Sequence, residues 1–313
     1  MRILFFGAGG VGSLFGGFLA RMGHDVSLLG RASHMDAIAK QGLSITGIWG
    51  DYRIKAFNLF TDAGEIKKKN ISFDVIFLTV KSYDTAAAME VVPSLMSEKT
   101  MLVSFQNGLG NSETILKKIK PEQYLAGRVI TGIETSPGKI KVTVTADPVA
   151  VGGLPGVKTL VRAFDIAQTL NSARIPCVPV PDILTVIWAK VIYNCALNGI
   201  CTIEEIPYGK ILDNERTRNQ MTEVVRECYA VGLKKGITLS PKTADEFINL
   251  LVKRLIPSTA THTTSMLQDL RNGKRIEIDS LNGVICRLGA ETGIPTPQNA
   301  CIVEAVLAKK AVL

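Results

Sequence analysis

The chain has 313 residues, 46% of them hydrophobic and 20% charged, which is typical of a folded globular protein of about two domains. The net charge of +8 includes one dense basic cluster, residues 67–69, without the aromatic platforms of a nucleic-acid site, so we expect no nucleic-acid partner. The sequence has no run of about 18 uncharged apolar residues that would predict a membrane span, so we expect a cytoplasmic protein. The six cysteines and three histidines lack metal-ligand spacing, so we expect no metal site.

The first predicted strand, residues 3–6, runs into a glycine-rich turn, and a predicted helix over residues 11–22 follows at once. The turn consists of Gly7, Ala8, Gly9, Gly10, Val11 and Gly12. In this G-x-G-x-x-G pattern the first glycine permits a sharp turn and the second lets the backbone approach a pyrophosphate. The third lets helix and strand pack closely, and the helix N-terminus can then bind the phosphates. The turn therefore predicts a dinucleotide site.

The end of the second predicted strand, residues 25–31, distinguishes the two nicotinamide cofactors. A carboxylate about 20 residues beyond the glycines accepts hydrogen bonds from the ribose 2′-hydroxyl of NAD. Here that position holds Gly30, followed by Arg31. A small residue leaves room for a 2′-phosphate, and a guanidinium can pair with it. We therefore expect NADP(H) rather than NAD(H).

Two continuous apolar runs, residues 73–81 and 100–105, are typical of central parallel strands buried on both faces. The first ends at Lys81, and the second is followed by Gln106-Asn107-Gly108. Open α/β sheets bind their ligands at the carboxyl edge, so we expect Lys81 and Asn107 near a ligand. Further strands are predicted over residues 43–48, 53–60, 129–135, 139–145, 149–154 and 175–180, and helices over residues 86–96 and 157–173.

After prolines at positions 176, 179 and 181, the pattern becomes helical almost throughout. The first helix there, predicted to begin at residue 183, is strongly apolar but carries Lys190, Asn194 and Asn198. These residues lie at i, i+4 and i+8 and therefore share one face. Because burying polar groups without partners is costly, this polar stripe indicates a helix that lines a ligand cavity.

The whole pattern predicts an α/β fold with two domains. An N-terminal Rossmann-type parallel sheet domain, residues 1–182, would bind the dinucleotide, and an all-α domain, residues 183–313, would bind substrate and carry the catalytic residues. The C-terminal helices could close a homodimer, although the pattern does not require one. Helices are predicted over residues 214–236, 241–255, 265–270, 280–292 and 298–308.

With these residues in place, the chain resembles the ketopantoate reductase (2-dehydropantoate 2-reductase) family over nearly its whole length. In the first domain the resemblance rests on the glycine turn, Arg31, Thr79-Val80-Lys81 and Gln106-Asn107-Gly108. In the second it rests on residues 188–198, 265–271, 276–279 and 282–283, which are the more specific motifs. The resemblance implies an enzyme of pantothenate biosynthesis that reduces 2-dehydropantoate, a 2-oxo acid, to pantoate with NADPH.

The resemblance also implies roles for single residues. The family's catalytic lysine falls on Lys190 and its conserved carboxylate on Glu277, while Arg31 would contact the 2′-phosphate. Lys81 and Asn107 would lie near the cofactor and the reacting carbonyl. The residues expected to hold the substrate are Asn194, Asn198 and Ser265. Since hydride transfer leaves negative charge on the carbonyl oxygen, we expect protonated Lys190 to act as the general acid and Asn107 to orient the carbonyl.

One position departs from the family pattern. Where the family commonly has an Asn-Gly pair that contacts the substrate, this chain has Tyr208-Gly209. Tyrosine can still donate to the substrate from its hydroxyl, but at a different reach, so the identity of the 2-oxo acid stays open. Two alternatives therefore remain: an NADP-dependent reductase of another 2-oxo acid, and a non-catalytic NADPH-binding sensor that has kept the fold.

Overall fold

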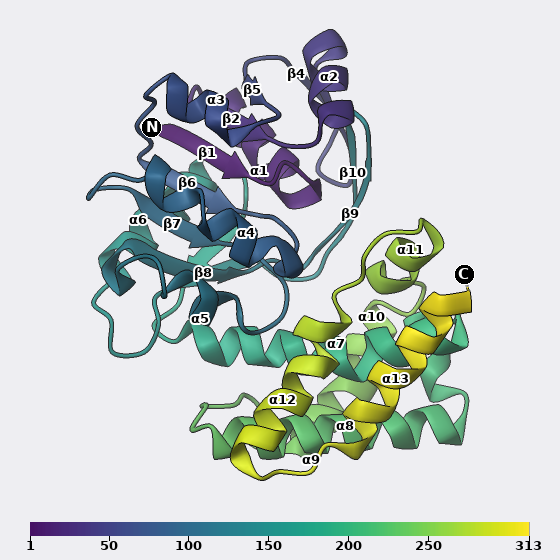
Figure 1. Ribbon diagram of the computed structural model, residues 1–313. Helices are drawn as coiled ribbons and strands as arrows, with labels where there is room; N and C mark the ends of the chain where they lie inside the picture. The colour runs from purple at the N-terminus through teal and green to yellow at the C-terminus, as the bar shows by residue number, and fades with distance from the viewer. Residues whose placement is uncertain (313) are drawn as a thin grey trace. The chain divides into compact units, whose positions relative to one another are not determined.

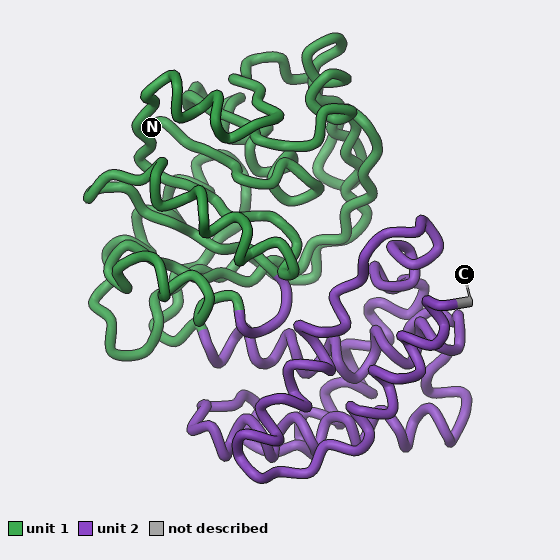
Figure 2. Tube along the Cα trace, viewed as in Figure 1, with its two compact units in different colours: residues 1–106, 111–183 green, residues 107–110, 184–313 purple. Residues whose placement is uncertain are grey.

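The computed structural model describes residues 1–312, and the chain divides into two compact units (Figure 2). The first unit holds residues 1–106 and 111–183, and the second holds residues 107–110 and 184–313. Each unit has its own hydrophobic core. The grouping of residues 107–110 with the second unit was not expected from the sequence.

The first unit is built on a largely parallel sheet (Figure 1). In the described part of the chain, residues 1–312, this sheet has eight strands in the order β12-β11-β8-β7-β6-β1-β2-β5. The chain passes from β1 to β2 on one side and to β6 on the other, which makes the end of β1 a topological switch point. The strands are β1 (Arg2–Phe6), β2 (Asp25–Leu29), β5 (Asn58–Phe60), β6 (Val75–Leu78), β7 (Met101–Ser104), β8 (Tyr124–Arg128), β11 (Val149–Gly152) and β12 (Cys177–Pro179).

A smaller sheet, with the order β4-β3-β10-β9, covers the first helix. Its strands are β3 (Leu43–Gly47), β4 (Tyr52–Ile54), β9 (Thr131–Ser136) and β10 (Lys139–Thr145). A Cβ on Gly17 of that helix would lie 2.8 Å from Ile45 Cδ1 and 3.0 Å from Ile54 Cδ1, so helix and sheet pack closely. The single strand expected over residues 53–60 is in fact two strands, which belong to different sheets.

The helices of the first unit are α1 (Gly10–Arg21), α2 (Ala32–Gln41), α3 (Ala63–Lys68), α4 (Thr85–Met89), α5 (Asn111–Ile115) and α6 (Leu160–Ser172). The helix expected over residues 86–96 is shorter, since α4 ends at Met89 and a separate 3₁₀ turn, Val92–Leu95, follows. Pro93 in that turn has no N–H for a helical hydrogen bond, which explains the break. The sequence patterns missed α2, α3, α5 and strand β8.

The second unit is helical. Its α-helices are α7 (Ile183–Glu204), α8 (Glu215–Lys234), α9 (Ala244–Leu250), α10 (Ile256–Ser258), α11 (Ser265–Arg271), α12 (Asn282–Thr292) and α13 (Pro297–Val312). A π-helical segment, Leu251–Leu255, joins α9 to α10, and 3₁₀ turns cover Tyr208–Leu212 and Ile278–Ser280. The start of α9 is stabilised by a capping box in which the Thr243 hydroxyl and the Glu246 carboxylate bond each other's backbone N–H.

Helix α7 forms the middle of this unit. Its residues Ile192, Cys195, Ala196 and Ile200 are at most 1% exposed. Among residues 1–312 it is also the one helix long and apolar enough to cross a membrane, with 56% of its most apolar window buried. Length and composition alone are weak evidence for a membrane span, because the core helix of a globular unit meets the same criteria.

Candidate functional site

The glycine turn after β1 fits tightly against its neighbours. Gly7 has φ +110°, and a Cβ there would lie 2.5 Å from the backbone nitrogen of Val80. A Cβ on Gly12 would lie 2.6 Å from the Gly7 carbonyl oxygen and 2.7 Å from Thr79 Oγ1, which itself donates to that carbonyl at 2.8 Å. Both positions therefore require glycine, as the fingerprint predicts.

The N-terminus of α1 is open to an anion. Its N-cap residue is Gly9, and within residues 1–312 no side chain caps the helix and no acidic residue lies in its first turn. Apart from its chain neighbours, no atom of the described chain comes within 4 Å of the place where a Cβ on Gly9 would lie. Exposed N–H groups at the positive end of a helix bind phosphate. This geometry fits the pyrophosphate of a dinucleotide.

The end of β2 packs against the same glycine turn. A Cβ on Gly30 would lie 3.0 Å from Met35 Cε and 3.1 Å from Ala8 Cβ, so this position has little room for a carboxylate side chain. Arg31 follows as the N-cap residue of α2, and it is exposed. On the neighbouring strand β6, Lys81 follows directly after the Thr79-Val80 backbone that contacts Gly7, and it is partly buried. The fit favours a cofactor with a 2′-phosphate beside Arg31.

In the second unit, the predicted catalytic lysine meets a predicted site residue. Lys190 Nζ on α7 donates to Asn107 Oδ1 at 2.6 Å. Gly108 has φ +80°, and a Cβ there would lie 2.3 Å from the Ser280 carbonyl oxygen, which accepts from Leu109 N–H at 3.0 Å. The segment 107–110 thus packs against the turn that follows Glu277.

Glu277 itself is 9% exposed, and its backbone organises that turn. Its carbonyl oxygen accepts from Ser280 Oγ at 3.0 Å and from Ser280 N–H at 3.2 Å. Lys190, Asn107 and the Glu277 turn are therefore linked through segment 107–110 and Ser280, although they lie far apart in the sequence.

Farther along α7, the polar stripe ends in the core. Lys190 and Asn194 are partly buried, while Asn198 is 5% exposed. The hydroxyl of Tyr208, a residue 3% exposed, donates to Asn198 Oδ1. Burial raises the pKa of Tyr208 well above its ordinary value, so the phenol stays protonated at neutral pH and remains a donor.

Ser265 is the first residue of α11, and it is exposed. The residue before it, Thr264, caps the helix by accepting from Met266 N–H at 3.2 Å. Thr264 also lies near the Tyr208 hydroxyl and lowers the pKa of Tyr208, against the larger effect of burial, so the start of α11 is close to the end of the stripe on α7. The glycine turn, Arg31 and Lys81 lie in the first unit, and the other predicted site residues lie in the second.

Sequence reasoning missed the aromatic residues around Tyr208. The Tyr193 ring lies 5.8 Å from the Tyr208 ring, edge to face, and the His262 ring lies 5.0 Å away. Tyr193 Oη is 3.0 Å from Thr259 Oγ1, and Tyr208 N–H donates to the His262 carbonyl at 3.1 Å. Tyr193 could have been found, because it is three residues after Lys190 and so shares the polar face. His262 comes from a loop with no periodic signal.

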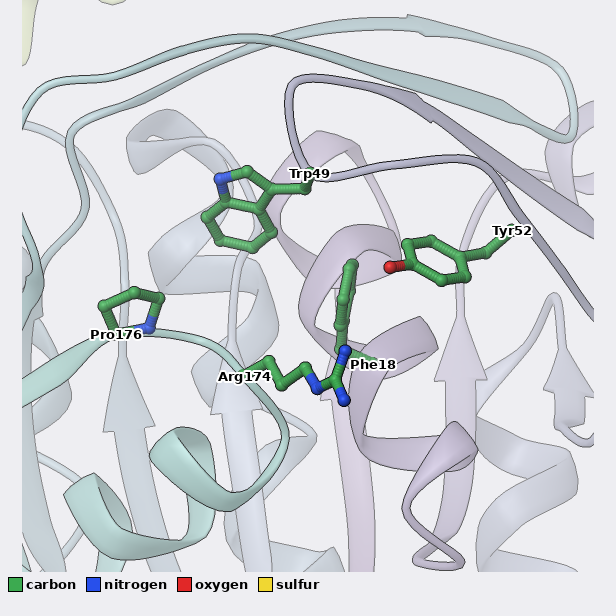
Figure 3. Close-up of a pocket in the computed structure, with 5 residues that line it drawn as sticks. All are labelled: Phe18, Trp49, Tyr52, Arg174 and Pro176. Atoms are coloured by element: carbon green, nitrogen blue, oxygen red, sulfur yellow. The ribbon is translucent and has the colours of Figure 1, made fainter.

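A hollow of about 270 Å³ opens elsewhere in the first unit (Figure 3). Phe18 of α1 and Trp49 and Tyr52 of the β3–β4 region form one side, and Arg174 and Pro176 form the other. Of the described residues that line it, none belongs to the predicted site. Among residues 1–312, no group of three or more histidine, cysteine, aspartate or glutamate side chains could hold a metal ion.

A doubly wound unit with an open glycine turn, followed by a helical unit with a partly buried polar stripe, is typical of the class of two-domain nicotinamide-dependent dehydrogenases. Comparison with known proteins narrows this class. The family model for ketopantoate reductase PanE/ApbA matches residues 3–156, and the model for its C-terminal part matches residues 182–310. The chain belongs to the ketopantoate reductase family.

Individual relatives agree with this assignment. The chain is 34% identical to the 2-dehydropantoate 2-reductase of Aquifex aeolicus, over 99% of this chain and 97% of that protein. A crystal structure of a PanE/ApbA family ketopantoate reductase from Ralstonia eutropha superimposes with a TM-score of 0.86 at 29% identity, covering 99% of each chain. The ternary structure of D-mandelate dehydrogenase with NADH and anilino(oxo)acetate gives a TM-score of 0.90 at 26% identity, covering 100% of this chain and 99% of the other.

Proposed function

We propose that this protein reduces 2-dehydropantoate to pantoate with NADPH. The observation that carries the proposal is the hydrogen bond from Lys190 Nζ to Asn107 Oδ1 on a helix whose polar stripe continues to Asn198, in a chain that belongs to the ketopantoate reductase family. A reductase of 2-oxo acids needs a proton donor and donors for a carboxylate, and these residues supply both. The cytoplasmic location and the homodimer stay predictions from the sequence.

The glycine turn and α1 would hold the pyrophosphate, with Arg31 on the 2′-phosphate and Lys81 nearby. When bound, the reduced nicotinamide supplies the hydride. Protonated Lys190 then donates a proton to the carbonyl oxygen as negative charge develops there. Because Asn107 Oδ1 accepts from Lys190 Nζ, Asn107 would fix the direction of the ammonium group, a different role from the orientation of the carbonyl that the sequence predicted. Glu277 supplies the buried carboxylate of the site, and Asn194, Asn198 and Ser265 bind the carboxylate and hydroxyl of the substrate.

The test is NADPH oxidation with a panel of 2-oxo acids that includes 2-dehydropantoate. We expect 2-dehydropantoate to give the highest kcat/KM, and NADPH to exceed NADH. If NADPH binds tightly but no 2-oxo acid causes its oxidation, the protein is a sensor and the proposal is wrong.

A second candidate is a reductase of a different 2-oxo acid. Tyr208 in place of the family's asparagine favours this alternative because a phenol ring differs in size and chemistry from an amide. The structural similarity to D-mandelate dehydrogenase shows that a closely similar fold acts on another acid. A kcat/KM for an aryl-substituted 2-oxo acid above that for 2-dehydropantoate would favour this candidate.

A further inference from the structure

The Asn198 side chain is a primary amide, and the two ends of an amide do opposite things. Its oxygen accepts hydrogen bonds and its nitrogen donates two. An anionic substrate is attracted to the nitrogen and repelled by the oxygen. A buried asparagine can rotate about the bond to its amide group and so exchange the positions of oxygen and nitrogen. It therefore binds a carboxylate well only where its surroundings hold the nitrogen toward that carboxylate.

In this protein the rotation of Asn198 is fixed by Tyr208. Asn198 Oδ1 accepts from the Tyr208 hydroxyl, and both side chains are at most 5% exposed. No hydrogen bond of Asn198 Nδ2 is found among the described residues, 1–312. The oxygen of the amide is thus occupied by a protein donor, and the nitrogen is left for another acceptor.

The direction of the bond between Tyr208 and Asn198 follows from the amide oxygen, which can only accept, so the Tyr208 hydroxyl donates its single proton to Asn198 Oδ1. Thr264, which caps α11 by accepting from Met266 N–H at 3.2 Å, lies near this hydroxyl and lowers the pKa of Tyr208, against the larger effect of burial. Because burial dominates, the phenol keeps the proton that it donates to the amide.

Tyr193, whose ring contacts the Tyr208 ring, offers a comparison. It is a partly buried tyrosine on the polar face of α7, and its ring packs edge to face on Tyr208. Its hydroxyl, however, lies 3.0 Å from Thr259 Oγ1. The two tyrosine rings are neighbours, but the Tyr193 hydroxyl reaches Thr259 whereas the Tyr208 hydroxyl reaches Asn198.

We propose that Tyr208 is a positioning residue, which holds the Asn198 amide with its NH₂ group toward the substrate and so selects a carboxylate in the 2-oxo acid. This role rests on the proposed function, and it explains what a tyrosine would do at position 208, where the family commonly has asparagine. Tyr208 acts through Asn198, and its own hydroxyl is committed to the protein.

The variant Tyr208→Phe tests this role because it removes only the hydroxyl. The Asn198 amide can then turn its oxygen toward the substrate, so we expect KM for the 2-oxo acid to rise by about tenfold, the usual effect of losing one hydrogen bond to a charged group. We expect kcat to change by less than about twofold, because the proton donor is not touched. NADPH binding and the thermal unfolding midpoint serve as controls for the fold.

Two comparisons separate positioning from a general structural role. Tyr193→Phe, the matched control, should leave KM unchanged. In an Asn198→Ala background, adding Tyr208→Phe should raise KM no further, since the group it positions is gone. Preference for the acid over its methyl ester, measured as a ratio of kcat/KM, should fall about tenfold in Tyr208→Phe and stay unchanged in Tyr193→Phe.

The inference is overturned if Tyr208→Phe leaves KM and the acid-to-ester ratio unchanged, or if its effect persists in full without the Asn198 amide. Calorimetric binding of the 2-oxo acid gives the same comparison without turnover. Binding with the expected pattern but no NADPH oxidation would overturn the proposed function and support the positioning role. A wild-type protein that binds no 2-oxo acid would overturn both.

Discussion

At the scale of single residues, Lys190 and Asn107 form the pair on which the chemistry depends. Replacing Lys190 by alanine removes the proton donor while the 2-oxo acid still has Asn194 and Asn198. Since general acid catalysis contributes about 10²–10⁴-fold, we expect kcat of Lys190→Ala to fall within that range and NADPH affinity to stay within about twofold. Steady-state kinetics and a cofactor titration check both.

The matching controls are Lys190→Arg and Lys210→Ala. Arginine keeps the positive charge but does not release a proton at neutral pH, so it should not restore turnover. Lys210 is exposed and pairs with Asp213 at 2.9 Å, so its loss should leave kcat unchanged. Turnover of Lys190→Ala close to wild type would refute the assignment of the general acid.

Arg31 is the residue that should distinguish the two cofactors. Its guanidinium follows Gly30 at the N-cap of α2, where the structure leaves little room for the carboxylate that NAD requires. Removing a charge-assisted bond to phosphate should raise KM for NADPH by about 10- to 100-fold in Arg31→Ala, while KM for NADH changes little. Equal losses with both cofactors would place Arg31 away from the 2′-phosphate. Arg53→Ala in the same unit is the control.

At the scale of elements, α1, α2 and the β9–β10 hairpin meet at one buried histidine. His34 Nδ1 accepts from Gly138 N–H at 3.0 Å in the hairpin turn, and Nε2 lies 3.0 Å from Ser13 Oγ on α1. Ser13 in turn donates to the Ala8 carbonyl of the glycine turn at 3.3 Å. The accepting Nδ1 implies the tautomer with hydrogen on Nε2, which is the neutral ring.

This histidine makes the protein sensitive to acid. Burial lowers the pKa of His34 below its ordinary 6.5, more than a backbone hydrogen bond with Ser136 raises it. The unfolded chain therefore takes up a proton near pH 6.5 while the folded chain does not, so stability falls as the pH drops from about 6.5 toward the folded pKa. Unfolding midpoints between about pH 8 and pH 5.5 should show this loss.

The variant His34→Gln isolates the contribution of His34, because glutamine keeps a donor and an acceptor but does not titrate. Burial also lowers the pKa of His24 and of His262, so some acid sensitivity should remain in the variant. We expect a shallower loss of stability than in the wild type. Identical pH profiles would show that His34 is not a source of the effect.

How far elements could be predicted depended on whether their signal was local. The buried strands β6 and β7 and the long helices α7 and α8 have continuous or periodic apolar patterns, and the sequence located each of them. Strand β8 begins after a 3₁₀ turn, Pro121–Gln123, and its central Ala126 and Gly127 have low strand propensity, so only pairing with β7 and β11 explains it. Short α2 and α3 likewise gain stability from tertiary packing.

The same distinction holds for the site. Glycine spacing and the stripe on α7 are local, so the sequence could identify candidates for both. The hydrogen bond from Tyr208 to Asn198 joins the 3₁₀ turn Tyr208–Leu212 to α7, and neither its existence nor its direction follows from spacing. The packing of Gly108 on Ser280 is equally non-local, which is why the grouping of residues 107–110 with the helical unit could not be expected.

At the scale of the whole molecule, the two separate cores have a consequence for cofactor binding. A ligand stabilises the part of a protein that it contacts and slows local opening there first. The glycine turn and Arg31 belong to the first unit, whereas helices α8 and α12 belong to the core of the second. NADPH alone should therefore protect the two units unequally.

Hydrogen exchange with and without NADPH measures this difference. At about 100 times Kd, binding stabilises the native state by about 2.7 kcal/mol, so amides of residues 7–13 and 30–35 should exchange more slowly. Amides of α8 should exchange at the rate of the free protein. In Gly12→Ala, whose Cβ would lie 2.6 Å from the Gly7 carbonyl, protection of the turn should disappear. Protection of α8 with no change in the glycine turn would contradict the assignment of cofactor binding to the first unit.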